Sequence, residues 1–391
     1  MINNNTALGA AKIGKNDGKL HIFSFFSGCG FLDLGFEKSG YTIDLVNEFS
    51  PAFLEAYKYS REKLGLKQPQ FGYSNMDVTK YLDEKSNELK GYIQKIHNQH
   101  AYVGFIGGPP CPDFSVAGKQ RGREGDNGKL SLTYTKLIID QKPDFFLFEN
   151  VKGLWKTAKH RAFYEELKRK LSRAGYIMTE RLCNSLEFGA PQDRDRILLF
   201  GILNNNLTKK IELRKEFPWD SHILYNLEET KKLNWPTRGM FVEDTDIPQP
   251  HDIPVELTVQ YWFNKNDVIN HPNGKDHFIS RQGLPKMQTV EEGDVSRKSY
   301  KRLHRWRYSP TVAYGNNEVH LHPYKPRRLT VAEALSLQTL PKDFCLPNDM
   351  TLSDKFKTIG NGVPFVMSKA IATTINEYLN KLIEDGTLHS L

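Results

Sequence analysis

The stretch YVGFIGGPPCPDFSVAG, Tyr102–Gly118, places a thiol directly after an apolar run. The run itself, Tyr102–Ile106, predicts a buried strand that ends at Gly107–Gly108. Cys111 follows between two prolines. Because each proline fixes its own φ and restricts the residue before it, we expect a stiff turn that presents the thiol. The turn follows the carboxyl end of a strand, which is the edge where open α/β sheets bind ligands.

Two roles are open to Cys111 on this loop alone. A lone cysteine is commonly a small buried apolar residue. It is a nucleophile only where its pKa is lowered, which a sequence does not display. We interpret Cys111 as a nucleophile because of motifs elsewhere in the chain.

Apolar strands alternate with helical stretches from residue 19 to about residue 203. This alternation predicts an α/β fold with a Rossmann-like, doubly wound parallel sheet that helices cover on both faces. The predicted strands are Leu20–Phe26, Thr42–Asn47, Tyr102–Ile106, Asp144–Phe148, Tyr176–Leu182 and Arg196–Gly201. The predicted helices lie near residues 31–39, 51–64, 79–97, 131–141 and 155–174.

The pattern changes after Leu203, and residues 206–326 have few periodic runs. Their tryptophans predict a second, smaller and irregular folded domain, because aromatic residues at such density usually need a core. These are Trp219, Trp235, Trp262 and Trp306.

Periodic structure returns at Arg327. Thr330, followed three residues later by Glu333, predicts a capping box. After a Gly-Asn-Gly turn at 360–362, Val363–Ile383 predicts an amphipathic helix that packs back onto the first domain. We therefore expect four segments, namely a flexible tail at 1–18, a first domain at 19–205, the irregular domain at 206–345 and a returning segment at 346–391.

Composition limits the class of protein. No apolar run approaches the roughly 18 residues of a membrane span, and the first 18 residues lack the apolar core of a signal peptide. The four cysteines are far apart, without a CxxC pair, so neither a zinc site nor a disulfide framework is indicated and a reducing cytoplasm fits. A net charge of +8 is compatible with a polyanionic partner.

The stretch FFSGCGFLDLGFE, Phe25–Glu37, places Gly28 and Gly30 between the first strand and the first helix. Glu48 lies about 20 residues on, where nucleotide-binding α/β folds keep an acid for the ribose. Asp33 stands where a dinucleotide fingerprint has its third glycine. A nucleoside cofactor without a pyrophosphate, such as S-adenosylmethionine, suits this pattern better than NAD, although a tight turn without ligand is the alternative.

Two further motifs carry ionisable groups. FFLFENV, Phe145–Val151, ends an apolar strand in Glu149 and Asn150, so partial desolvation should raise the carboxyl pKa and allow proton donation. A helix N-cap pair is the alternative, mainly for Asn150. In APQDRDRILLF, residues 190–200, the side chains of Gln192, Arg194 and Arg196 share one face, and paired guanidiniums can clamp a carboxylate or carbonyl. A solvated strand edge is the alternative there.

Together these motifs resemble the C5-cytosine DNA methyltransferase family. FSGCG with LDLGFE looks like its cofactor motif, PPCPDFS its nucleophile loop, ENV its acid motif and QDRDR its paired arginines. RRLTVAEALSLQTLP and GNGVP look like its carboxy-terminal motifs, and 206–326 stands where the family keeps its variable target-recognition region. Phe31 occupies a position where the family usually has glycine, which we expect to narrow the cofactor turn.

The resemblance implies that Cys111 adds to C6 of a flipped-out cytosine, while Glu149 donates towards N3 and Arg194 and Arg196 orient Glu149 and the base. It implies S-adenosylmethionine as methyl donor, no metal and a double-stranded DNA substrate. The residues expected at the cofactor are Phe26, Gly28, Gly30, Glu48, Phe49, Asp77, Val78, Pro110, Leu130 and Asn361.

RKSYKRLHRWR, Arg297–Arg307, contains six Lys or Arg residues, no acid, and interleaved aromatic rings. We expect this cluster to contact DNA phosphates or guanine edges, with a solvated basic face as the alternative. The expected DNA-binding residues are Ser115, Arg297, Lys298, Lys301, Arg302, Arg305 and Arg307. The following residues, with turn signals at 315–317, predict a hairpin, and His320 and His322 are interpreted as structural.

Three other functions remain open on the sequence. They are an RNA methyltransferase of the same chemistry, a DNA-binding module without catalysis, and a nicotinamide oxidoreductase, the last disfavoured by the incomplete glycine pattern. We expect a monomeric bacterial or phage enzyme of a restriction-modification system, located in the cytoplasm at the nucleoid.

Overall fold

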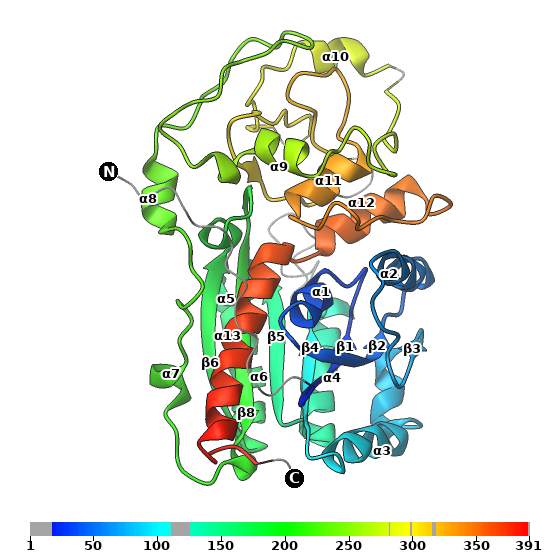
Figure 1. Ribbon diagram of the computed structural model, residues 1–391, viewed down its shortest axis with the longest axis vertical. Coiled ribbons are helices and arrows are strands. Elements are labelled where there is room, and N and C mark those ends of the chain that lie inside the picture. Colours follow the sequence, from blue (N-terminus) through cyan, green and yellow to red (C-terminus); the bar gives the residue numbers. More distant parts are fainter. Residues whose placement is uncertain (1–17, 111–125, 281, 298, 315–317, 390–391) are drawn as a thin grey trace.

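A computed structural model describes residues 18–110, 126–280, 282–297, 299–314 and 318–389 (Figure 1). Its centre is a seven-stranded sheet in the order β3-β2-β1-β4-β5-β8-β6. The strands are β1 (Leu20–Phe25), β2 (Thr42–Asn47), β3 (Tyr73–Ser74), β4 (Tyr102–Gly107), β5 (Phe145–Val151), β6 (Tyr176–Asn184) and β8 (Asp195–Leu203). All six predicted strands are therefore confirmed, and β3 is added at the edge.

The sheet is mostly, not wholly, parallel. β1, β2, β3, β4 and β5 run parallel, whereas β8 runs antiparallel to both β5 and β6. The segment between β6 and β8 is too short for the crossover that a parallel pair needs, so the chain reverses directly. The expected all-parallel sheet is wrong at this edge, and its reversal brings the start of β8 beside the end of β5.

Helices cover both faces of the sheet, as predicted. One face packs against α1 (Phe31–Glu37), α2 (Pro51–Lys63) and α13 (Phe365–Glu384). The other packs against α3 (Ser86–His97), α4 (Asp126–Gln141) and α6 (Ala158–Arg173). The predicted helix at 79–97 is interrupted, because a 3-10 turn η1 (Val78–Leu82) precedes α3, and α5 (Lys152–Lys156) is separate from α6.

The C-terminal helix belongs to the same core as the first strands. Ile371 and Ile375 of α13 are buried with Ile22 of β1, and Ser368 Oγ donates to Leu32 O at 2.6 Å. This confirms the expectation that the chain returns to its first domain. The capping box of Thr330 and Glu333 at the start of α11 (Val331–Leu337) is confirmed as well.

The upper part of the molecule in Figure 1 has little regular structure. Its short helices are α8 (Leu227–Lys232), η5 (Val255–Leu257), α9 (Val259–Lys265), α10 (Leu284–Gln288), α11 and α12 (Leu352–Asn361). α7 (Leu213–Glu216) and the short η3 (Ser185–Phe188) and η4 (Asn204–Asn206) lie beside the sheet. Within the described residues, no helix combines the length and apolarity needed to cross a bilayer.

Three local expectations are corrected. Trp219 packs in the core of the sheet domain, where its indole donates to Thr179 Oγ1 at 2.9 Å, and not in the irregular part. The turn of the predicted hairpin, at 315–317, lies outside the described residues. The flanking residues pair elsewhere, because β9 (Ser309–Pro310) pairs in parallel with β7 (Gln192–Asp193) and Leu321 forms bridges with Arg302 and Arg328. The predicted turn at 360–362 begins two residues later, at Gly362, because α12 continues through Asn361.

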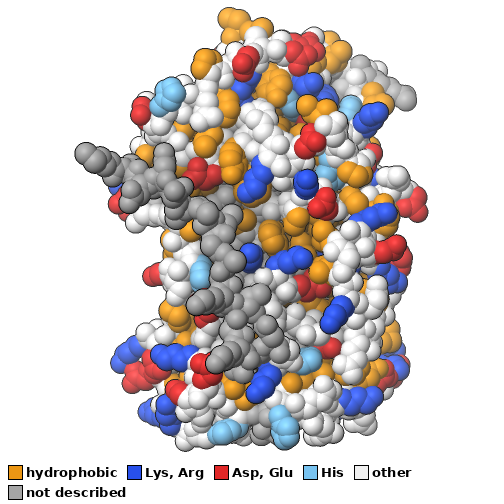
Figure 2. Space-filling view, in the orientation of Figure 1, with side chains coloured by type: hydrophobic (Ala, Val, Ile, Leu, Met, Phe, Trp, Pro, Cys, Tyr) orange, Lys and Arg blue, Asp and Glu red, His pale blue; other side chains and the backbone are white. Residues whose placement is uncertain are grey.

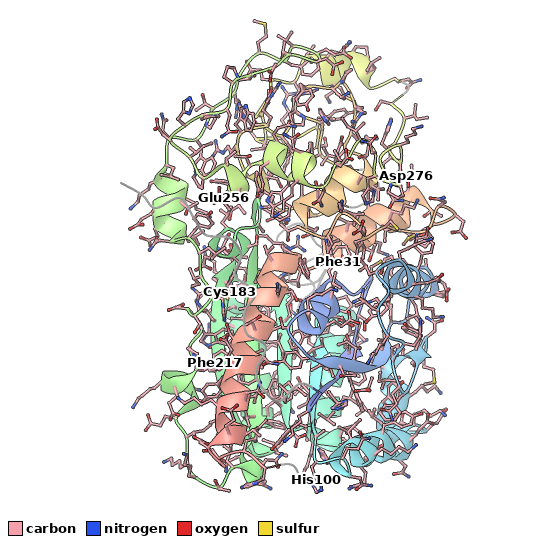
Figure 3. All side chains as sticks on the ribbon, in the orientation of Figure 1. Phe31, His100, Cys183, Phe217, Glu256 and Asp276 are labelled. Atoms are coloured by element: carbon pink, nitrogen blue, oxygen red, sulfur yellow. The ribbon has the colours of Figure 1, made fainter. Side chains whose placement is uncertain are left out.

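Phe31 does not narrow the turn after β1. Its ring is 3% exposed and meets Phe344 edge-on at a centroid distance of 5.3 Å, at the junction of α1 with the upper helices (Figure 3). A Cβ on Gly362 would lie 2.1 Å from the Phe31 ring. The larger side chain is thus accommodated by a glycine on the returning segment, on the side of α1 that faces the upper helices.

Candidate active site

The carboxyl ends of three neighbouring strands define one edge of the sheet. Phe25 of β1 is paired with Gly107 of β4, and Gly107 is paired with Phe148 of β5. The next residue of each strand, Phe26, Gly108 and Glu149, therefore lies at the same edge. This is the edge at which open α/β sheets bind ligands.

The turn after β1 is built from residues with left-handed backbone. Gly28 has φ +56° and Gly30 has φ +76°, a conformation that favours glycine. A Cβ on Gly30 would lie 2.3 Å from the Tyr57 ring, so this glycine is required by packing. A Cβ on Gly28 would meet only Thr358 Oγ1, at 3.8 Å, which leaves open space for a ligand above the turn.

A buried arginine supports this turn from below. Arg61 of α2 is 1% exposed and donates to Cys29 O at 3.1 Å and to Gly30 O at 2.7 Å. It is paired with Glu37 at 3.1 Å. No sequence motif singles out Arg61, although its place four residues after Tyr57, on the same face of a helix, is a signal that the two side chains meet.

Glu48, which follows β2, contacts the turn after β1 through its side chain. Its carboxylate accepts from the backbone N–H of Gly28 and of Ser50, both at 2.8 Å. Burial raises the pKa of Glu48, and the two backbone donors counteract the rise. The adjacent Phe49 is 67% exposed. A carboxylate and a free aromatic face beside an open glycine suit the ribose and base of a nucleoside.

The remaining predicted cofactor residues lie around the same turn or on elements beside it. Asn75, which was not predicted, donates to Glu48 O at 2.8 Å and Phe49 O at 2.9 Å, and so ties the chain before Asp77 and Val78 to the end of β2. Asp77 is exposed at the start of η1 and Val78 is buried. Pro110 and Asn361 are exposed, and Leu130 is half-buried on α4.

Glu149 lies at the foot of the turn that leads to Cys111. Glu149 as a whole is 7% exposed. Arg196 Nε of β8 lies 2.6 Å from Glu149 Oε1. A Cβ on Gly108 would lie 2.4 Å from Glu149 Oε2. Burial raises the pKa of Glu149, and the positive charges of Arg196 and Arg194 counteract the rise. Cys111 itself lies outside the described residues, as do Ser115 and Lys298.

Asn150 holds the same turn and does not cap a helix. Its side-chain amide donates to Pro109 O at 3.3 Å, and its carbonyl accepts from Val151 N at 2.8 Å. The N-cap of α5 is Val151, which makes no side-chain cap. The N-cap alternative for Asn150 is therefore wrong, and its contact fixes the chain two residues before Cys111.

The QDRDR segment has its predicted buried face, but its two arginines do different things. Gln192, Arg194 and Arg196 are all less than 9% exposed. Arg196 meets Glu149, whereas Arg194 donates to Val312 O and Gly360 O, each at 2.7 Å. Burial lowers the pKa of Arg194 well below its ordinary value. The expectation that both arginines orient Glu149 by direct contact is corrected for Arg194, which lies just before β8, donates to the end of α12 and acts on Glu149 through its charge.

A family model of the C-5 cytosine-specific DNA methylase matches residues 20–377. The chain belongs to this family. A relative named Type II methyltransferase M.NmeDI, from Neisseria meningitidis serogroup C, is 55% identical over 94% of this chain and 86% of its own length. Type II methyltransferase M.NgoPII of Neisseria gonorrhoeae is 28% identical over 93% of this chain and 97% of its own.

Solved structures share the fold of this methylase. A prophage-encoded DNA modification methyltransferase from E. coli aligns with a TM-score of 0.61 at 22% identity, over 92% of this chain and 99% of the other. Spodoptera frugiperda DNMT2 aligns with a TM-score of 0.57 at 16% identity, over 91% and 99%. At these identities the likeness concerns the fold alone.

Two of the predicted DNA-binding arginines of the methylase are internal. Arg302 is fully buried, and its guanidinium donates to the backbone carbonyls of Met287, Val290, His322 and Lys325. Arg305 is 2% exposed and paired with Glu292 at 2.8 Å. A guanidinium occupied in this way has no donor for DNA, so the prediction is wrong for Arg302 and Arg305.

The other described members of the cluster reach the surface. Arg297 is exposed, and Lys301 and Arg307 are half-buried. Lys and Arg side chains are visible across the middle of the face in Figure 2, between the sheet and the irregular part. His320 and His322 are both buried, as expected for structural side chains, and burial lowers the pKa of each to about 3. Among the described residues, no three His, Cys, Asp or Glu side chains gather as metal ligands.

Gly108→Ala is expected to reduce methyl transfer roughly 100-fold, since a misplacement of about 1 Å is enough for a loss of that size. Gly108 does not have a left-handed backbone, so alanine fits its backbone conformation without strain. The added Cβ would displace the Glu149 carboxyl. Steady-state kcat is the measurement.

Gly91→Ala on α3 is the matched control, because a Cβ at Gly91 meets no atom within 4 Å. Gly91→Ala should keep full activity. Unchanged kcat in Gly108→Ala would show that the carboxyl need not stand where the structure has it.

Proposed function

We propose that this methylase transfers a methyl group from S-adenosylmethionine to C5 of a cytosine within a specific double-stranded DNA sequence, with Cys111 as the nucleophile. The single observation that carries the proposal is the buried Glu149–Arg196 pair beneath the turn that Asn150 fixes just before Cys111. Membership of the family makes cytosine in DNA the substrate. It also disfavours the RNA, oxidoreductase and non-catalytic alternatives.

The proposed chemistry starts at the pyrimidine ring. C5 of cytosine is a poor nucleophile, and addition of the Cys111 thiolate to C6 makes C5 enamine-like. Burial raises the pKa of Glu149 and so favours its protonated form, which donates a proton towards N3 as the C6–S bond forms. Arg196 holds the carboxyl in place. C5 would then bond to the methyl group as the bond between that methyl and the donor's sulfonium sulfur breaks, which leaves a neutral thioether. Loss of the C5 proton to a base, and departure of the Cys111 thiolate from C6 as N3 returns its proton to Glu149, would restore the aromatic ring. Covalent catalysis thus divides one unfavourable step into easier ones.

S-adenosylmethionine supplies an electrophilic methyl group when it is bound. The open side of Gly28 and the backbone-held carboxylate of Glu48 are suited to its adenosine. The exposed Phe49 offers an aromatic face to the adenine. Asn75, two residues before Asp77 and three before Val78, donates to the backbone carbonyls of Glu48 and Phe49 and so holds this segment beside them. The target cytosine must leave the duplex to reach Glu149, because a stacked base cannot present its ring atoms to a buried pair.

We also propose a biological setting. Relatives named Type II methyltransferases support a role as the modification enzyme of a restriction-modification system. The sheet core within 19–205 and the returning segment 346–391 would carry catalysis, and the irregular part within 206–345 would recognise the target. We expect a monomer acting on the nucleoid in the bacterial cytoplasm.

The alkaline limb of the pH–rate profile should report Glu149. The carboxyl must be protonated to donate, and its raised pKa keeps it protonated to higher pH than an ordinary glutamate. Rate should therefore fall as pH rises through this pKa. Arg196→Gln removes a cation that lowers the pKa of Glu149, so the limb should move to higher pH, whatever happens to kcat.

Lys168→Gln is the control for that measurement, because Lys168 pairs with Glu165 and Glu180 on the opposite face of the sheet from α13. It should leave the limb in place. A limb that does not move in Arg196→Gln would remove Glu149 from the role of proton donor.

Bisulfite sequencing of DNA from cells that express the chain tests the proposed function as a whole. Wild-type protein should protect cytosines in one sequence context, and Cys111→Ser should protect none. Protection that persists in Cys111→Ser, or no enriched context with soluble wild-type protein, would contradict the proposal.

A further inference from the structure

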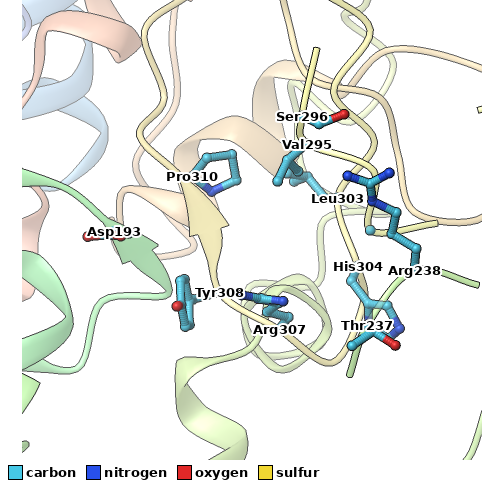
Figure 4. A pocket seen from close by; sticks show the side chains of 11 residues that line it. Asp193, Thr237, Arg238, Val295, Ser296, Leu303, His304, Arg307, Tyr308 and Pro310 are labelled. Atoms are coloured by element: carbon cyan, nitrogen blue, oxygen red, sulfur yellow. The ribbon is translucent and has the colours of Figure 1, made fainter. Parts of the chain in front are cut away.

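A cavity of about 410 Å³ lies where the irregular part meets the short β7–β9 pair (Figure 4). Its walls come from the chain around Arg238, from residues 293–296 and from residues 303–310. Asp193 of β7 and Pro310 of β9 form the side nearest the sheet domain. The three positions from Asp193 to Arg196 span at most about 10 Å of extended chain, so the Cα atom of Arg196 lies no more than about 10 Å from that of Asp193 in the cavity wall.

His304 contributes a fixed donor to this cavity. Its Nδ1 accepts from the backbone N–H of Trp306 at 3.0 Å. Because Nδ1 accepts this hydrogen bond, the proton of the neutral ring is on Nε2. Burial lowers the pKa of His304, which favours the neutral form. Gly293, with φ +86°, packs against the Cδ2 side of the His304 ring. A Cβ on Gly293 would lie 3.4 Å from His304 Cδ2.

Two guanidiniums add further donors. Arg307 makes a single long hydrogen bond to the protein, from Nη1 to Pro236 O at 3.4 Å, among the described residues. Arg238 lies 3.6 Å from Asp294 and is half exposed. Most of their N–H groups therefore have no acceptor in the described protein. Figure 4 shows both side chains at the cavity wall.

The remaining wall is mainly apolar. Tyr308 is held edge-on by Trp235 at a centroid distance of 5.0 Å, and Val295, Leu303 and Pro310 line the cavity beside it. Thr237 and Ser296 add two hydroxyl groups. Asp193, the one carboxylate of the lining, already accepts from Asn184 at 2.6 Å and is paired with Lys231 at 2.9 Å. A carboxylate in the wall disfavours a phosphate, whereas apolar walls suit a flat base.

We propose that this cavity receives the major-groove edge of a guanine in the recognition sequence and that Arg307 reads it. The assignment rests on the proposed function and deepens it. Guanine presents two adjacent acceptors, O6 and N7, whereas adenine presents one acceptor and one donor. The guanidinium of Arg307 has donors and no acceptor, so it matches the two acceptors of guanine, whereas adenine would place its amino donor against a donor. Arg307 has the fork geometry for a bidentate contact.

Arg307→Lys is the decisive variant, because it keeps the positive charge and removes the planar fork. Once the wild-type recognition sequence is known, kcat/KM is measured on duplexes that carry each single-base change. For wild-type protein, one guanine position should be strongly discriminated. In Arg307→Lys and Arg307→Ala, discrimination at that position alone should fall roughly 10- to 100-fold.

Arg214→Ala is the matched control, on an exposed arginine of α7 outside the cavity. Its base profile should be that of wild type. A uniform loss across all duplexes in Arg307→Ala, with Arg307→Lys close to wild type, would identify a phosphate contact and overturn the inference. An unchanged profile in both variants would overturn it too. Both results require an active wild-type enzyme, so they are distinct from failure of the proposed function.

Discussion

The contact on which the site depends joins the buried carboxyl of Glu149 to the guanidinium of Arg196. Burial favours the protonated carboxyl and the guanidinium favours the carboxylate, and burial is the larger effect. The pair exists because β8 runs antiparallel to β5, which places Arg196 opposite Val151 and within reach of Glu149. Gly108 leaves the volume that the carboxyl occupies. The position of the Glu149 carboxyl therefore depends on the direction of β8 and on the glycine at position 108 together.

Arginines also organise the chain from within by donating to backbone carbonyls. Arg61 holds the glycine turn, Arg194 joins β8 to the end of α12, and Arg302 gathers four carbonyls of the irregular part. Each connects segments that local hydrogen bonding cannot connect. A net charge of +8 therefore overstates the basic surface available to DNA, and a linear run of basic residues need not be a basic face.

The sequence predicts the strands and the main site residues, but not the direction of every strand or which basic side chains are buried. The strands follow from apolar runs, and Glu149 and Arg196 follow from where their motifs stand relative to those runs. The reversed β8 was not predictable, because periodicity reports a strand and not its direction. The burial of Arg302 and Arg305 was missed because an irregular segment has no period that shows which side chains face inward. The expectation that Phe31 narrows the cofactor turn was wrong because Gly362, which makes room for its ring, is distant in sequence.

The most direct measurement of the central claim uses duplex DNA in which the target cytosine carries fluorine at C5. Fluorine cannot leave as the C5 proton does, so the ring should remain bonded to the enzyme after methyl transfer. The account predicts a covalent complex, stable to denaturation, whose DNA-linked peptide contains Cys111. A complex linked through Cys29, Cys183 or Cys345, or methyl transfer without any covalent complex, would contradict it.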